Sequence, residues 1–356
     1  MNSVKPIRWG IMGTGWVAQH FMADLRHVEG AVRAAVASRS EDRARNVAKR
    51  FGMRNAHGSY EALAKDPLVD VVYVATENHL HAEHCLLALR EGKHVLCEKP
   101  FSMSFESASR VVECAKSRGL FCMEAMGTRF VPAILESKRR IDAGEIGIPL
   151  LLTADFGTPI SDSGSNRFYD RQRGGGALWD RGVYAISLAI WLFGKPLHIT
   201  SQAQMHASGT DTTFSSVLRF PDNKLAVVSA SIGAYSGNEA IVAGSAGRLR
   251  LHEPICCPQR VTIKGSSAMA GDPKSDLNPQ STRERVRRLV SRIKPYLPEN
   301  MLLSTVLHLP VTGYGYCHEA SEVMRCVREG LLECPLMPLG ETLTIVETME
   351  NMQKNF

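Results

Sequence analysis

The sequence lacks the features that would place a protein in a membrane or in an oxidising compartment. It has no run of eighteen apolar residues, so we expect no membrane span. It has no Cys-x-x-Cys pair, and most of its nine cysteines lie scattered in apolar runs, which predicts reduced core thiols. The first residues pass into a strand without the apolar core and cleavage site of a signal peptide, so we expect a cytoplasmic protein.

Charge of either sign is also moderate. The formal net charge is +6, and much of it lies in residues 283–294, where six Arg and Lys residues share a predicted helix with Val286, Leu289, Val290 and Ile293. Such a helix could dock on the protein's own C-terminal domain or lie on an anionic membrane surface. Because it carries no Trp or Phe anchor, we expect docking. We expect no nucleic-acid partner.

A glycine-rich turn near the N-terminus indicates a dinucleotide site. Residues 7–11 form a short apolar strand, and Gly13, Gly15 and Ala18 follow as the G-x-G-x-x-A fingerprint. The first Gly makes the tight turn, the second lets backbone approach a pyrophosphate, and the small third residue lets the helix pack on the strand. The helix that opens here offers free N–H groups to phosphates.

The end of the next strand predicts which dinucleotide binds. Enzymes that use NAD carry an Asp or Glu here for the ribose hydroxyls, whereas this chain has Ser38 and Arg39. A carboxylate would repel a 2′-phosphate, and a hydroxyl with a guanidinium would bind it. A solvated arginine at a helix start is the simpler alternative, but the fingerprint favours NADP(H).

Strands and helices alternate through the first part of the chain, which has 356 residues, enough for two domains. Residues 69–76 are almost continuously apolar, as is typical of a strand buried on both faces. We therefore predict that residues 1–128 form an NADP-binding Rossmann domain with a doubly wound parallel sheet of six strands. The pattern locates five of these strands, at 7–11, 31–37, 69–76, 94–97 and 120–126.

Two polar segments follow the third and fourth of these strands. The strand at 94–97 runs into Glu98, Lys99 and Pro100, and the proline restricts the residue before it. A charged pair at the carboxyl end of a strand is where an open α/β sheet places its chemistry. After Thr76, the turn contains Asn78 and three histidines, His79, His81 and His84, but no carboxylate or thiolate set completes a metal site, so we expect no metal.

From about residue 129 the alternation stops. After a helix at 133–143, strands follow one another with few helices between them, which predicts an α+β domain over 129–356 with an open, mostly antiparallel sheet. The expected strands are 150–156, 200–206, 214–220, 225–231, 239–244, 248–251 and 260–264, and the closing helices are 318–329 and 341–353.

One helix in this half begins at a glycine-rich stretch, 174–176. Asp180 and Tyr184 follow four residues apart, so they share a face of the helix. A carboxylate and a phenol on one face suit proton handling. A dipole-stabilising Asp beside a core Tyr explains the spacing equally well.

Together these residues resemble the glucose–fructose oxidoreductase/inositol dehydrogenase/MocA family over almost the whole chain. The resemblance rests on segments 13–18, 78–81, 92–100, 174–184 and 318–339. Tyr184 stands where many relatives carry His, which is similar to the branch that includes dimeric dihydrodiol dehydrogenases, NADP-dependent D-xylose 1-dehydrogenases and sugar 3-ketoreductases.

The resemblance implies roles for individual residues. Lys99 would lie at the nicotinamide and the substrate hydroxyl, Tyr184 would donate or accept the proton, and Asp180 would orient the substrate. We expect a phenol beside an ammonium to have its pKa lowered toward the working range. The expected substrate contacts are Arg129, Trp179, Asp180 and Tyr184. The expected cofactor contacts are Gly13, Gly15, Trp16, Val17, Ser38, Arg39, Thr76, Asn78, His81, Glu98 and Lys99.

The leading functional hypothesis is an NADP-dependent oxidoreductase acting on a sugar or cyclic polyol or ketone, assembled as a homodimer or homotetramer through the C-terminal sheet. A non-catalytic nucleotide or sugar sensor is the second hypothesis, and retention of Lys99 and Tyr184 argues against it. A membrane-surface enzyme is the third, and it rests on the basic helix alone. Gly127 replaces a Trp that is typical of this branch, which suggests a different and bulkier substrate. The segment 271–300 also exceeds the family's usual length.

Overall fold

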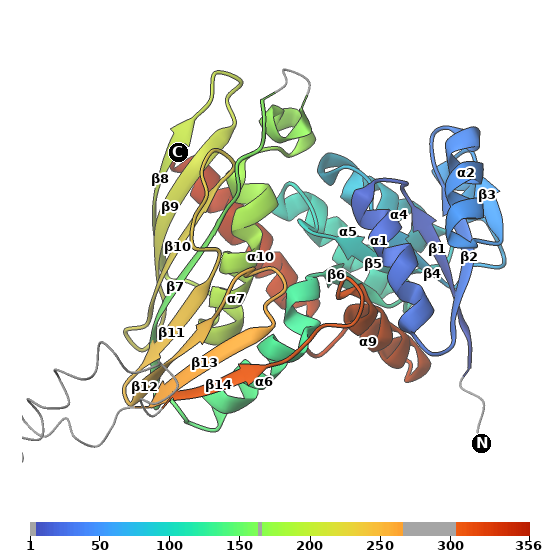
Figure 1. Ribbon diagram of the computed structural model, residues 1–356. Coiled ribbons are helices and arrows are strands. Elements are labelled where there is room, and N and C mark those ends of the chain that lie inside the picture. The colour runs from blue at the N-terminus through green and yellow to red at the C-terminus, as the bar shows by residue number, and fades with distance from the viewer. Residues whose placement is uncertain (1–4, 163–165, 266–303) are drawn as a thin grey trace, which may run out of the picture.

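The computed structural model describes residues 5–162, 166–265 and 304–356, and the chain builds two β-sheets (Figure 1). The predicted basic helix at 283–294 lies outside the described residues. Within the described part of the chain, no helix is long and apolar enough to cross a bilayer.

The N-terminal sheet is the predicted doubly wound one. Its six strands are all parallel, in the order β3-β2-β1-β4-β5-β6, which confirms the predicted fold class. Because β1 has β2 on one side and β4 on the other, the strand order reverses there, and ligands of such sheets bind at this crevice. The strands are β1 (Ile7–Met12), β2 (Ala31–Ala37), β3 (Asn55–His57), β4 (Val71–Val74), β5 (His94–Glu98) and β6 (Cys122–Ala125).

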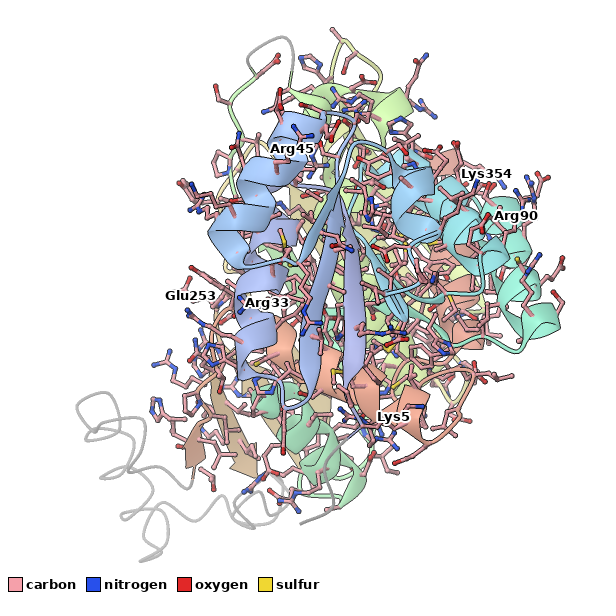
Figure 2. The ribbon with its side chains drawn as sticks, turned by 90° about the vertical axis from the view of Figure 1, so that its right-hand side faces the viewer. Lys5, Arg33, Arg45, Arg90, Glu253 and Lys354 are labelled. Carbon is pink, nitrogen blue, oxygen red and sulfur yellow. The ribbon has the colours of Figure 1, made fainter. Side chains whose placement is uncertain are left out.

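Local signals explain where the helices of this half begin and end. The side chains of Ser40, Ser59 and Ser104 accept N-cap hydrogen bonds, and Gly52 and Gly119 close helices in the left-handed conformation. Figure 2 turns this half toward the viewer and shows charged side chains on its outer surface. The helices are α1 (Trp16–Asp24), α2 (Glu41–Phe51), α3 (Tyr60–Ala64), α4 (His81–Arg90) and α5 (Phe105–Arg118).

The second sheet has eight strands in the order β14-β13-β12-β11-β7-β10-β9-β8. Only β7 and β10 pair in parallel, so the predicted mostly antiparallel sheet is confirmed. The strand β14 was not predicted. The strands are β7 (Pro149–Gly157), β8 (His198–Met205), β9 (Asp211–Arg219), β10 (Leu225–Ser231), β11 (Ala240–Gly244), β12 (Gly247–Leu251), β13 (Arg260–Gly265) and β14 (Ser304–His308).

Helices cover one face of this sheet. Figure 1 shows α7 (Val183–Phe193) and α10 (Leu339–Lys354) between the two sheets, while α6 (Pro132–Asp142) and α9 (Tyr316–Arg328) lie lower in the view. The helix α7 is almost wholly apolar and mostly buried. The opposite face of the sheet carries a patch, which we call the outer patch, of half-exposed apolar side chains in register: Leu151, Val217, Leu225 and Val227.

Candidate active site

A cavity of about 790 Å³ lies at the carboxyl ends of the N-terminal strands, and we call it the first cavity. It is the crevice that the reversal of strand order predicts. All the residues that the sequence assigned to the cofactor line it: Gly13, Gly15, Trp16, Val17, Ser38, Arg39, Thr76, Asn78, His81, Glu98 and Lys99.

The glycine turn fits a dinucleotide sterically. Gly13 has φ +119°, and a Cβ on it would lie 2.3 Å from the Ala75 carbonyl oxygen, so only glycine fits there. A Cβ placed on Gly15 would have no other heavy atom within 4 Å, so this side of the turn is open to a ligand. The helix α1 starts at Trp16 without a side-chain cap, which leaves its first N–H groups free for phosphate oxygens.

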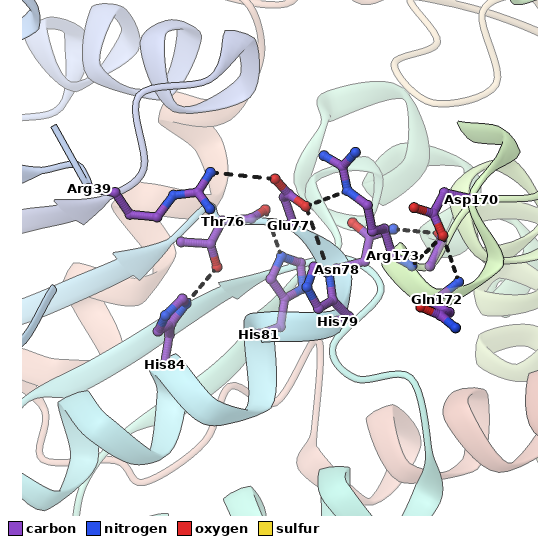
Figure 3. A network of polar contacts seen from close by, with 11 residues as sticks. Arg39, Thr76, Glu77, Asn78, His79, His81, His84, Asp170, Gln172 and Arg173 are labelled. Carbon is purple, nitrogen blue, oxygen red and sulfur yellow. Dashed lines mark hydrogen bonds and ion pairs between the residues drawn. The ribbon is translucent and has the colours of Figure 1, made fainter. Parts of the chain in front are cut away.

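Arg39 at the end of β2 takes part in a network that crosses between the two halves of the molecule (Figure 3). Its Nη2 lies 3.8 Å from Glu77 Oε1, and the other Glu77 oxygen accepts a 2.8 Å hydrogen bond from Arg173 Nε. The Arg173 hydrogen bond holds the pKa of Glu77 below its usual range. The sequence reasoning assigned no role to Glu77 or Arg173, because nothing in the spacing joins positions so far apart.

The polar turn after β4 braces the first cavity. Asn78 Nδ2 donates to the Gly174 carbonyl at 3.0 Å, a second contact between the halves. The ring of His81 lies between the Pro100 and Thr76 carbonyl oxygens, at 2.8 and 3.2 Å, and burial lowers its pKa to about 4. His81 is therefore a neutral structural brace at pH 7. The Nδ1 atom of His84 contacts Thr76 Oγ1 at 2.9 Å.

Lys99 lies where the first cavity meets a second one of about 480 Å³. Its Nζ donates to the Asp180 carbonyl at 2.8 Å and is 3.8 Å from Asp180 Oδ1. It also lies 4.8 Å from the centroid of the Tyr184 ring. Glu98, the residue before Lys99, accepts hydrogen bonds from the hydroxyl of Tyr73 and from the Lys99 backbone N–H. These two hydrogen bonds fix the position of its carboxylate.

Tyr184 lines the second cavity with Lys99 and Asp180, so the structure brings the three predicted catalytic side chains together. The expected pKa shift is wrong in direction. Burial raises the pKa of the Tyr184 phenol well above its usual value, with smaller contributions from neighbours such as Cys256 and Tyr316, because the phenolate would be poorly solvated.

The helix that carries Asp180 and Tyr184 does not begin as the regular α-helix that their four-residue spacing predicted. Leu178–Gly182 form a π-helical turn, in which the Val183 N–H donates to the Leu178 carbonyl, before α7 begins. The carboxylate of Asp211 accepts from the Leu178 N–H at 2.7 Å and fixes this start. Asp180 and Tyr184 nevertheless both reach the second cavity.

Two predicted substrate contacts do not line either cavity. The side chain of Arg129 is buried and donates hydrogen bonds to the Glu341 carboxylate, at 2.6 Å, and to the Ser187 hydroxyl. Glu341 thus neutralises the charge of Arg129 inside the protein. Trp179 is fully buried as a core side chain. We therefore remove Arg129 and Trp179 from the site.

Gly127 does line the second cavity. A Cβ on Gly127 would lie 3.4 Å from an Oε atom of Glu319, a fully buried carboxylate on α9. A side chain at position 127 would therefore contact the Glu319 carboxyl group at this wall of the cavity.

The sequence is similar to known families and to individual proteins. Residues 7–126 match the oxidoreductase family with an NAD-binding Rossmann fold, and residues 134–250 match the GFO/IDH/MocA C-terminal domain. Trans-1,2-dihydrobenzene-1,2-diol dehydrogenases from Macaca fascicularis and Homo sapiens are each 32% identical over 352 residues, which cover 98% of this chain and 96% of each relative.

Solved structures agree with these matches. A 3-ketoreductase from Actinomadura kijaniata, in complex with NADP and TDP-benzene, has a TM-score of 0.80 and 25% identity and covers 99% of this chain and 98% of its own. A levoglucosan dehydrogenase, in complex with NADH and L-sorbose, has a TM-score of 0.81 over 99% of this chain and 96% of its own, and at 20% identity it supports the fold alone.

Proposed function

We propose that this chain, a member of the GFO/IDH/MocA family and an NAD(P)-dependent oxidoreductase acting on CH–OH groups, acts on a sugar or on a cyclic polyol or ketone. We also propose that its cofactor is NADP(H). The observation that carries the proposal is the position of Lys99 and Asp180. Both line the first cavity and the second, so they join a dinucleotide site to a pocket of small-molecule size.

The preference for NADP(H) rests on Ser38 and Arg39. Both line the first cavity at the end of β2. The side chain of Arg39 is 75% exposed and its nearest carboxylate, on Glu77, is 3.8 Å away. Exposed ion pairs contribute little, so Arg39 exchanges Glu77 for a 2′-phosphate at small cost. When bound, the nicotinamide would supply or accept the hydride.

Tyr184 is the proton donor in the reductive direction. Its raised pKa keeps the phenol protonated at neutral pH, so Oη delivers a proton to the substrate oxygen as the carbonyl becomes an alcohol. The ammonium of Lys99 lies beside the ring and stabilises the phenolate that this transfer leaves. The Asp180 carbonyl positions Lys99 Nζ, and Asp180 also lines the second cavity, where it would orient the substrate.

We assign residues 1–128 to cofactor binding and 129–356 to substrate binding and assembly. The outer patch supports a homodimer or homotetramer, because Leu151, Val217, Leu225 and Val227 are 36–43% exposed on a sheet face that the described residues leave open. We expect the enzyme to be cytoplasmic.

The proposal is tested by a screen. Purified protein is incubated with sugars, keto-sugars and cyclic diols, each with NADP(H) and with NAD(H), and nicotinamide absorbance is followed. We expect turnover of at least one ring compound with a preference for NADP(H). Binding of NADPH without turnover across the panel would favour a sensor on the same fold.

A further inference from the structure

The second cavity carries more positive charge than a pocket for a neutral sugar requires. Its charged lining consists of three cations and two carboxylates, Lys99, Arg167, Arg181, Glu98 and Asp180. Glu98 accepts hydrogen bonds from the Tyr73 hydroxyl and from the Lys99 N–H. Asp180 is the carboxylate that forms ion pairs with all three cations.

Asp180 gathers these cations around one point. Its Oδ2 lies 3.2 Å from Arg181 Nε, and its Oδ1 lies 3.6 Å from Arg167 Nη2 and 3.8 Å from Lys99 Nζ. Asp180 and Glu98 together leave the three cations of the lining with one positive charge in excess. The surplus charge in a partly enclosed cavity is unfavourable until an anion arrives.

The two guanidinium groups are held in place by aromatic rings. Arg167 Cζ lies 4.1 Å from the centroid of Phe168, and Arg181 Cζ lies 4.6 Å from that of Phe156, whose ring in turn contacts Tyr184. The Nη1 atom of Arg167 is buried without a hydrogen-bond partner in the described structure. Stacked guanidinium groups with unused N–H groups suit the planar, bidentate recognition of carboxylates and phosphates.

The position of Arg181 shows which of the two cavities its positive charge serves. Arg167 lines both cavities, so a cofactor phosphate could account for it, but Arg181 lines only the second. We propose that the substrate carries an anionic group, a carboxylate or a phosphate monoester, which Arg181 and Arg167 bind while the reacting carbon faces Lys99 and Tyr184. This inference rests on the proposed function.

The test compares ring compounds that differ only in the group at C6, which is neutral or anionic: D-glucose, D-glucuronate and D-glucose 6-phosphate, and D-galactose with D-galacturonate. We expect at least one anionic member to exceed its neutral partner about tenfold or more in kcat/KM. Arg181→Gln should lower that ratio roughly tenfold or more, mainly through KM, and Arg181→Lys should restore part of it. The acid and phosphate arms identify which anion is preferred.

A second measurement does not depend on turnover. Acetate and inorganic phosphate are titrated against the NADPH-bound enzyme, with cofactor fluorescence as the readout. Arg181→Gln should weaken binding of one of the two about tenfold, whereas Arg110→Gln, on the exposed face of α5, should leave it unchanged.

Equal anion binding in Arg181→Gln and the parent, or no binding to the parent, would overturn the inference, as would a preference for the neutral sugars. Absence of turnover with intact, Arg181-dependent anion binding would instead count against the proposed reaction and leave the anion site standing.

Discussion

The two cavities are built in opposite ways. Most of the lining of the first comes from residues 13–99, and its key features are backbone ones: a glycine turn, a helix start and the ends of adjacent strands. The lining of the second comes from short segments spread between Trp16 and Tyr316. The first cavity is thus specified by local sequence, and the second by the packing of the two sheets.

The largest expected effect separates chemistry in the second cavity from binding in the first. Tyr184→Phe should lower kcat by roughly 10²- to 10⁴-fold, because the proposed proton donor is lost, while the dissociation constant of NADPH stays within about threefold. Lys99→Ala should show a similar loss in rate. Steady-state kinetics and NADPH fluorescence titration measure the two quantities.

Tyr316→Phe is the matched control, since this phenol lines the same cavity but lies on another element. We expect a loss of no more than about tenfold. Comparable losses in both phenylalanine variants would mean that the proton does not come specifically from Tyr184.

The next effect concerns Glu124 on β6, a fully buried carboxyl close to the junction of the two halves. Burial raises its pKa to about 7 from 4.5, and one of its oxygens has no hydrogen-bond partner in the described structure. A raised carboxyl pKa means that the folded state holds the proton more tightly. Stability is therefore highest below pH 4.5 for this group and falls as the pH rises through 7, by about 3 kcal/mol in all.

Glu124→Gln should flatten the dependence of the unfolding free energy on pH between 5 and 8, as measured by urea denaturation. Glu113→Gln, an exposed change on α5, serves as the control. An unchanged slope in Glu124→Gln would show that this carboxyl does not titrate in that range.

A smaller effect tests the first cavity by itself. Arg39→Ala should weaken NADPH binding by about 1.5–3 kcal/mol and leave NADH binding nearly unchanged, since only the 2′-phosphate loses a charge-assisted contact. Arg45→Ala, which lies outside the cavity on α2, should alter neither. Equal weakening of both cofactors would remove Arg39 from phosphate recognition.

The smallest effect concerns the link between the halves. The Glu77–Arg173 pair is about one third exposed on both sides, so Arg173→Gln should change the unfolding free energy by less than about 1 kcal/mol. Added salt should have little further effect on the variant. A loss of several kcal/mol would mean that this network holds the two halves together.

The difference between the two cavities also explains which features could be predicted from the sequence. Five strands of the first sheet, and the eleven predicted cofactor contacts that line the first cavity, follow from local motifs, because each motif has its own strand and helix as context. The strand β3 is only three residues long, and β14, which pairs with β13, has no buried side chain and so no alternation of apolar and polar residues to reveal it.

The second cavity was foreseen only where a family motif supplied the residue. Arg129 was misplaced because a charged residue near a motif gives no sign that Glu341, more than two hundred residues away, neutralises it. Arg167 and Arg181 were missed because their meaning depends on sharing one carboxylate, a relation that only the folded chain defines.

The π-helical turn at Leu178–Gly182 has a consequence for how this segment tolerates insertions and deletions. A π-turn is an α-helix that has accommodated one additional residue, and each residue of an α-helix turns the chain by about 100°. Removal of one residue from this turn would restore a regular helix and rotate Asp180 by about that angle relative to Tyr184. Two chains of this kind that differ by one residue here would align well over the rest of the helix yet present different side chains to the substrate.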